Sequence, residues 1–223
     1  MINCVAFDWN GTIFSDTAAC CEAVNEVLKF LKLKPVSLKT YRAHFDVPVT
    51  KTYLGLGISQ QQINNNSAEI VKTFHTNYEI RAVKVRTRAY TRELLEWLSK
   101  NNIESIIFSN HIDEPIKKQL KRLKLEKYFS YVIANSELNT SLNGRNKQEK
   151  LRDYTQGKNL LPNEILVIGD TVEEIEIGKE LGVSTVAITQ GFCSTTRLKS
   201  ANPDYLIDSL KEVMGIIRII NSY

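Results

Sequence analysis

Short apolar runs recur along the chain and predict the strands of a buried sheet. They are Ile2–Phe7, Glu104–Phe108, Tyr131–Ala134, Glu164–Ile168, Ser184–Thr189 and the shorter Tyr205–Ile207. Positions 165–168 of the fourth run are all apolar. A continuous apolar run is typical of a parallel strand that is covered on both faces. The pattern therefore predicts a parallel sheet.

Segments with helical periodicity lie between the later runs. They include Pro115–Leu125, Lys147–Tyr154 and Val172–Leu181, and the last is followed by Gly182, which suits a left-handed helix cap. Strands that alternate with helices are typical of α/β proteins in which helices cover both faces of the sheet. We therefore expect an α/β fold with a Rossmann-like parallel sheet core.

The stretch 16–84 interrupts this alternation, because its patterns are helical and contain no convincing strand. Thr17–Leu31 and Gln60–Tyr78 are each predicted to form a helix. We expect a small α-helical cap domain at 16–84, inserted into a core domain made of 1–15 and 85–223. An insert after the first strand lies over the carboxyl ends of the strands, where open α/β sheets bind their ligands.

Composition and charge exclude several classes of protein. Hydrophobic residues make up 43% of the 223 residues and charged residues 24%, which is ordinary for a globular domain. The net charge of +4 is mild and basic residues are interspersed with acids, so we expect no nucleic-acid partner. We see no signal peptide and no span of about 20 apolar residues, so no membrane partner is expected.

The cysteines indicate in which cellular compartment the protein is expected. The four cysteines show no paired metal-ligand spacing, so they predict neither a zinc site nor a disulfide framework. Reduced thiols fit a cytoplasmic protein best. We expect a cytoplasmic monomer or homodimer.

Candidate chemistry begins at Asp8-Trp9-Asn10-Gly11-Thr12, directly after the first strand. An Asp at the carboxyl end of a buried strand, followed by a glycine turn, places a carboxylate at the rim of an α/β site. Taken alone, the same pattern suits a helix N-cap or an Asx turn equally well.

Other strand ends carry complementary groups. Ser109 ends the second strand, Asp170 ends the strand at 164–168, and Glu174 follows one helical turn later. Lys147 opens a predicted helix. A parallel sheet brings these groups together, and they combine oxygen ligands for Mg²⁺ with a cation for a phosphate.

The order and spacing of these groups resemble the four motifs of the haloacid dehalogenase superfamily. Those motifs are Asp-x-Asp-Gly-Thr, a Ser or Thr after the second strand, a Lys, and Gly-Asp followed by an acid. The resemblance covers essentially the whole chain, and its later part is similar to phosphatase-like members. The position of the insert resembles the subgroup with a helical cap after the first motif.

The resemblance implies a metal-dependent phosphatase acting on a small phosphorylated molecule. It implies that Asp8 attacks phosphorus and forms an aspartyl-phosphate. It also implies that Mg²⁺ is held by Asp8, the backbone carbonyl of Asn10, and Asp170, with Glu174 acting directly or through water.

Further roles follow from the same resemblance. Ser109 and the amide of Asn110 are expected to hold phosphoryl oxygens, and Lys147 to offset the negative charge. The alternative for Lys147 is a surface lysine at the start of a polar helix. Gly11 and Thr12 are expected beside the substrate. Trp9 is expected either to shape the substrate pocket or to pack the cap against the core.

Asn10 departs from the family pattern, in which a second Asp acts as general acid and base. Such help is typically worth ~10²–10⁴ in rate, and an amide cannot supply it. The substrate then has a good leaving group, turnover is slow, or another residue supplies the proton. The candidates for that role are Asp16, His44, Asp46 and His75.

Two other functions stay open. One is a phosphonatase-like carbon–phosphorus hydrolase, whose similar Asp-Trp-x-Gly-Thr turn also lacks the second Asp and which needs a cap lysine that forms a Schiff base. The other is a catalytically weakened, phosphate-binding or regulatory member of the family.

Overall fold

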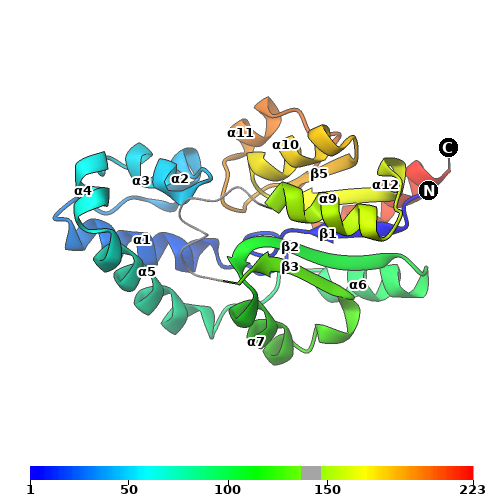
Figure 1. Cartoon of the computed structure of the whole chain (residues 1–223), viewed down its shortest axis with the longest axis horizontal. Coiled ribbons are helices and arrows are strands. Elements are labelled where there is room, and N and C mark those ends of the chain that lie inside the picture. The colour runs from blue at the N-terminus through cyan, green and yellow to red at the C-terminus, as the bar shows by residue number, and fades with distance from the viewer. Residues whose placement is uncertain (137–146, 223) are drawn as a thin grey trace.

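A computed structural model of the chain describes residues 1–136 and 147–222. It shows an α/β part built on one sheet, with a group of helices beside it (Figure 1). Within the described residues, no helix combines the length and apolarity that crossing a membrane requires.

In the part of the chain that the structure describes, six strands form a single sheet in which every pairing is parallel. The strands are β1 (Cys4–Phe7), β2 (Glu104–Ile112), β3 (Tyr131–Asn135), β4 (Ile165–Gly169), β5 (Ser184–Ile188) and β6 (Tyr205–Ile207). Their order is β3-β2-β1-β4-β5-β6, so the direction of the winding reverses beside β1. Ligands of open α/β sheets bind at such a switch point. The predicted parallel α/β core is confirmed.

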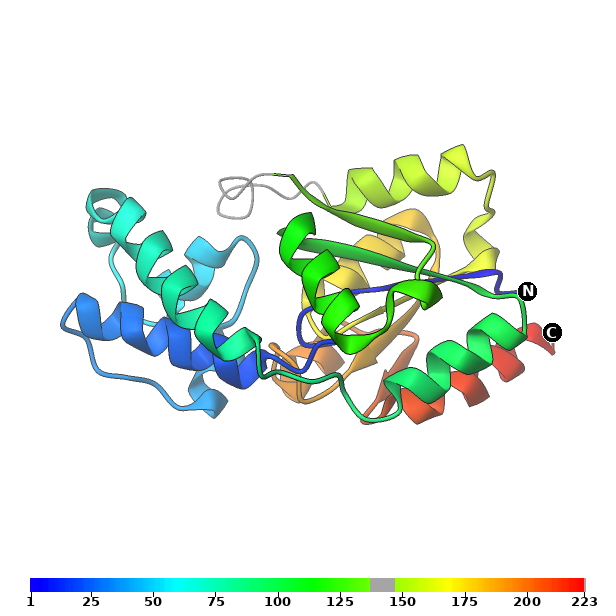
Figure 2. The same ribbon diagram turned by 90° about the horizontal axis from the view of Figure 1, so that it is seen from below.

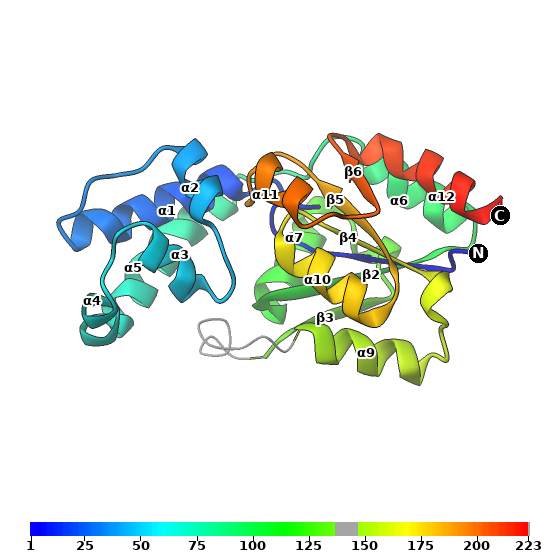
Figure 3. The same cartoon turned by 90° about the horizontal axis from the view of Figure 1, so that it is seen from above.

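Helices cover both faces of the sheet (Figure 3). On one face, α6 (Thr91–Lys100), α7 (Asp113–Leu123) and α12 (Val213–Asn221) pack on a core that includes Val5 and Phe7. On the other face, α9 (Lys147–Gly157) and α10 (Val172–Leu181) pack against Cys4 and Ala6. The other elements described in this part are α11 (Thr195–Ser200) and the 3₁₀ turns η1 (Glu126–Tyr128), η2 (Pro162–Glu164) and η3 (Leu210–Glu212).

The segment between β1 and α6 is helical. It contains α1 (Thr17–Phe30), α2 (Leu38–His44), α3 (Val49–Gly55), α4 (Gln60–Asn65) and α5 (Ser67–Ala82). The single helix predicted for Gln60–Tyr78 is therefore two helices. The break is at Asn66, whose side-chain amide donates to the Gln62 carbonyl at 2.8 Å. A side chain that bonds the backbone in this way competes with helix continuation.

The chain enters and leaves the helices α1–α5 through two adjacent segments, 13–15 and 86–88, which we call the connection ribbon (Figure 2). The Ser15 amide donates to the Arg86 carbonyl at 3.0 Å, and the Arg88 amide donates to the Ile13 carbonyl at 2.9 Å. These bonds lie on either side of an antiparallel bridge between Phe14 and Thr87.

Candidate active site

The turn after β1 places Asp8 at the carboxyl edge of the sheet. The Asp8 amide donates to the Ile168 carbonyl at 2.8 Å, which extends the pairing with β4 by one residue. Gly11 then turns the chain with a φ of +79°, and any side chain there would collide with the Asp170 carboxylate and the Phe192 ring. The turn therefore needs glycine for both its backbone conformation and its close packing.

Lys147, at the start of α9, lies against Asp8. Its ammonium donates to Asp8 Oδ1 at 2.7 Å and to Glu174 Oε1 at 2.5 Å, and its side chain is only 2% exposed. Burial works to lower the pKa of Lys147, but the charges of Asp8 and Glu174 outweigh it and hold the pKa above its usual range. The structure therefore places this lysine inside the protein rather than on its surface.

Glu174 is bonded at both carboxylate oxygens. Oε1 accepts from Lys147, while Oε2 accepts from the Thr171 amide at 2.9 Å and from the Thr171 hydroxyl. The bonds with Thr171 form a capping box at the start of α10. Although burial acts to raise the pKa of Glu174, the lysine and these donors lower it.

Asp170, at the end of β4, is fully buried. It accepts from the Thr12 hydroxyl at 2.7 Å and from the Phe192 amide at 2.5 Å. Burial and the charge of Glu174 raise the pKa of Asp170 to about 7. Burial likewise raises the pKa of Asp8, and the carboxylates of Glu174 and Asp170 add to the effect against the opposing charge of Lys147.

The balance of charge among these buried side chains indicates whether the site suits a divalent cation. Asp8, Asp170 and Glu174 are buried together beside one lysine, and within the described ranges Asp170 forms no ion pair. Uncompensated buried carboxylates are costly, so a cation fits there. No three His, Cys, Asp or Glu side chains converge as metal ligands in residues 1–136 and 147–222. A cation bound there would therefore have fewer than three of these side chains as ligands.

Ser109 and Asn110 lie on β2, which extends beyond its predicted end at Phe108. The strand continues because Ile112 pairs with Asn135 of β3 after a shift in register. The Ser109 hydroxyl accepts from the His111 amide at 3.1 Å. The Asn110 side-chain amide donates to Glu173 at 2.6 Å, and its Oδ1 is buried without a partner in the described part of the chain.

Asn10 contacts one of the four candidate proton donors, Asp16. The Asn10 side-chain amide donates to Asp16 Oδ2 at 2.7 Å and lies 3.1 Å from the Tyr78 hydroxyl, which also donates to Asp16. The Gly11 amide donates to the other Asp16 oxygen at 2.9 Å. Burial raises the pKa of Asp16, and these donors oppose the rise. Sequence reasoning missed Tyr78, for which there is no local signal.

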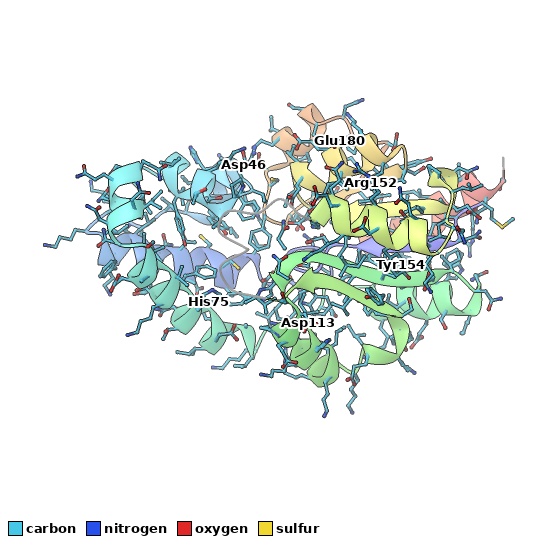
Figure 4. The ribbon with its side chains drawn as sticks, in the orientation of Figure 1. Asp46, His75, Asp113, Arg152, Tyr154 and Glu180 are labelled. Carbon is cyan, nitrogen blue, oxygen red and sulfur yellow. The ribbon has the colours of Figure 1, made fainter. Side chains whose placement is uncertain are left out.

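A cavity of about 200 Å³ joins this site to the helices α1–α5. Asp8, Asn10, Ser109, Asn110, Lys147 and Glu174 line it, so the structure brings these predicted residues together. Asp46 and His75 also line the cavity, and both lie on the helical part (Figure 4). His44 is not part of the lining; its ring lies 2.9 Å from the Thr40 carbonyl.

Three predicted substrate-binding residues lie behind the cavity instead of lining it. Trp9 is fully buried, donates to Gln119 of α7 at 2.6 Å and stacks on Phe14. Thr12 bonds Asp170, and Gly11 packs against it. The indole of Trp9 therefore packs into the hydrophobic core, whereas Gly11 and Thr12 contact Asp170 instead of the cavity.

Comparisons with known proteins agree with this architecture. The haloacid dehalogenase-like hydrolase family matches residues 5–188. A phosphoglycolate phosphatase from Pseudomonas fluorescens is 22% identical over 214 residues, which span 94% of this chain and 78% of that protein. A pyrophosphatase from Oceanobacillus iheyensis is 24% identical over 220 residues, which span 97% of each.

Among solved structures, a haloacid dehalogenase-like hydrolase from Streptococcus pneumoniae superimposes with a TM-score of 0.81 at 22% identity. The match spans 97% of this chain and 98% of that one. It shows the same fold, and the family match covers most of the chain, as the resemblance of the four motifs predicted. The chain belongs to the haloacid dehalogenase-like hydrolase family.

Proposed function

We propose that this protein is a magnesium-dependent phosphatase that hydrolyses a small organic phosphate through an aspartyl-phosphate on Asp8. The observation that carries the proposal is the buried contact of Asp8 with Lys147 at the sheet end of the cavity, with Ser109 in the same lining. Family membership and the names of two relatives, a phosphoglycolate phosphatase and a pyrophosphatase, support a phosphate substrate.

In this proposal Asp8 is the nucleophile. Lys147 bonds Oδ1, and no residue in the described ranges bonds Oδ2, so Oδ2 forms the bond to phosphorus. The bond from phosphorus to the alcohol oxygen breaks in the same step, and the leaving oxygen takes a proton from water. Water then hydrolyses the acyl phosphate and restores the carboxylate. Splitting the displacement into two steps lowers each barrier.

The surrounding groups bind and orient the phosphate. Lys147 and the Ser109 hydroxyl hold phosphoryl oxygens, and Glu174 keeps the lysine in place through its own bond with it. Asp8, Asp170 and the backbone carbonyl of Asn10 would hold Mg²⁺, which supplies positive charge to the phosphate when bound. We also propose that residues 16–84 act as a cap domain over the core made of 1–15 and 85–223.

The test is phosphate release from a panel of phosphorylated metabolites with and without Mg²⁺. We expect release that depends on Mg²⁺ and falls to background in Asp8→Asn. Asp153→Asn, on the exposed side of α9, is the matched control and should keep full activity. If the wild type released no more phosphate than Asp8→Asn, the phosphatase proposal would fail, and the regulatory alternative would remain.

The carbon–phosphorus hydrolase alternative needs a lysine from the helical part in the cavity. In the described lining, Lys147 of α9 is the only lysine, and residues 16–84 contribute none. No observation in the structure therefore favours this alternative over the phosphatase.

A further inference from the structure

The two ends of the cavity differ in chemistry. Asp8, Ser109 and Lys147 form the end at the sheet. The helices α1, α2, α3 and α5, with the chain between α2 and α3, form the other end. That second end is lined mainly by apolar and aromatic side chains, among them Val24, Tyr41, Phe45, Tyr53, Val71 and Phe74.

Three aromatic rings of the lining, those of Tyr41, Phe45 and Phe192, pack against one another. The ring centroids of Phe45 and Phe192 lie 4.6 Å apart, and those of Tyr41 and Phe45 lie 5.8 Å apart. Tyr41 and Tyr53 are only 2% and 3% exposed. A wall of buried, interlocked rings gains most from contact with an apolar or aromatic group of matching size.

The charge of the described lining leaves no place for a second anion. Lys147 is the only cation among those residues, and Asp8 and Glu174 already bond it. Burial lowers the pKa of His75, and burial together with His75 lowers the pKa of His111 to about 4, so both rings are neutral at neutral pH. Asp46 is paired with Arg197 at 3.4 Å, so this pair offers no free cation to a further anion.

The volume of the cavity indicates the size of substrate that fits it. A dry apolar cavity of about 150 Å³ is enough to hold benzene. The present cavity, of about 200 Å³, must take the phosphoryl group as well. A phosphate beside a single ring or a short alkyl chain matches this volume.

We propose, on the basis of the phosphatase activity proposed above, that the substrate is a phosphate monoester of a small aromatic or apolar alcohol without a second anionic group. Phosphoglycolate and pyrophosphate, which appear in the names of the two relatives, each carry such a group. Both are expected to be poor substrates of this enzyme.

The first test compares benzyl phosphate, phosphoglycolate and the neutral amide of phosphoglycolate. We expect kcat/KM to fall in the order benzyl phosphate, amide, phosphoglycolate, with at least tenfold between the first and the last. The amide matches phosphoglycolate in size, so the difference between these two isolates the cost of the carboxylate. Phosphoglycolate turned over as well as benzyl phosphate would overturn the substrate proposal and leave the phosphatase intact.

A variant tests the charge argument directly. Val71→Lys places a cation in the lining and should raise the ratio of kcat/KM for phosphoglycolate to that for its amide by about tenfold or more. The matched control is Ile80→Lys on the same helix, at a side chain that is 63% exposed and outside the lining. It should leave the ratio unchanged. An equal change in both variants would contradict a role for the lining.

Binding without turnover separates the two proposals. Calorimetry with benzylphosphonate and phosphonoacetate, which the phosphatase reaction cannot cleave, reports the preference of the cavity whether or not phosphate is released. Tighter binding of benzylphosphonate supports the substrate class even if the panel assay fails. Equal or tighter binding of phosphonoacetate overturns it.

Discussion

At the scale of single residues, the contact between Asn10 and Asp16 limits which residues are tolerated at position 10. Its side-chain amide donates to Asp16, which is fully buried and also accepts from Tyr78 and from the Gly11 amide. The aspartate typical of the family would place a second carboxylate against Asp16. Asn10 and Asp16 therefore form a matched donor and acceptor, and changing one requires changing the other.

We predict that Asn10→Asp lowers the free energy of unfolding by about 1–3 kcal/mol, because the buried Asp16 then faces an acceptor instead of a donor. The double variant Asn10→Asp with Asp16→Asn reverses the pair and should recover most of this loss. Urea unfolding at pH 7.5 measures both. A single variant as stable as the wild type would show that the contact does not matter.

At the scale of elements, the start of α10 links a helix cap to the active site. Thr171 caps the helix, and its amide and hydroxyl hold Glu174, which in turn bonds Lys147. The helix therefore begins beside the residue that contacts Lys147. A change in the cap can reach Asp8, the proposed nucleophile, through three successive contacts.

Thr171→Ala is predicted to cost about 0.5–2 kcal/mol of stability, the usual range for a lost N-cap. It should also lower kcat, because Glu174 loses a donor that fixes its carboxylate, whereas Thr171→Ser should retain both. Ser194→Ala removes the side-chain N-cap of α11 at a residue outside the described lining, and it serves as the control. A similar loss of stability without a loss of kcat is expected there. Equal kcat values for the two alanine variants would argue against the link.

At the scale of the whole molecule, the parallel sheet explains which residues of the site could be predicted from the sequence. Asp8, Ser109 and Asp170 each follow an apolar run, and parallel strands bring such positions to one edge. The partner of Asp16 could not be predicted, because Tyr78 reaches it only through the packing of α5 against α1. The break at Asn66 was missed because the apolar periodicity continues across it. The buried position of Trp9 could not be predicted, because its indole bonds Gln119, a residue of a helix distant in sequence.

The stability of the whole molecule should depend on the protonation of His111. Burial, assisted by His75, lowers its pKa to about 4, below the ~6.5 of an unfolded chain. The unfolded state therefore binds the proton more tightly, so stability present above about pH 6.5 is lost as the pH falls toward 4.

Between pH 7.5 and 5.0, His111→Gln is predicted to lose less stability than the wild type, by an amount on the order of 1 kcal/mol. Urea midpoints at the two pH values measure the difference. His44→Gln, at an exposed histidine, is the control and should follow the wild type. Identical pH dependence in His111→Gln and the wild type would contradict the prediction.

The connection ribbon has a consequence for how such enzymes diversify. Because segments 13–15 and 86–88 lie side by side, the helices between them leave and rejoin the core at nearly one point. One contiguous stretch of the gene could therefore be exchanged, lengthened or shortened while the strands that carry Asp8, Ser109 and Asp170 keep their places. With the proposed division, in which the helices select the substrate and the sheet carries the reacting groups, these two properties could evolve at different speeds within a single polypeptide.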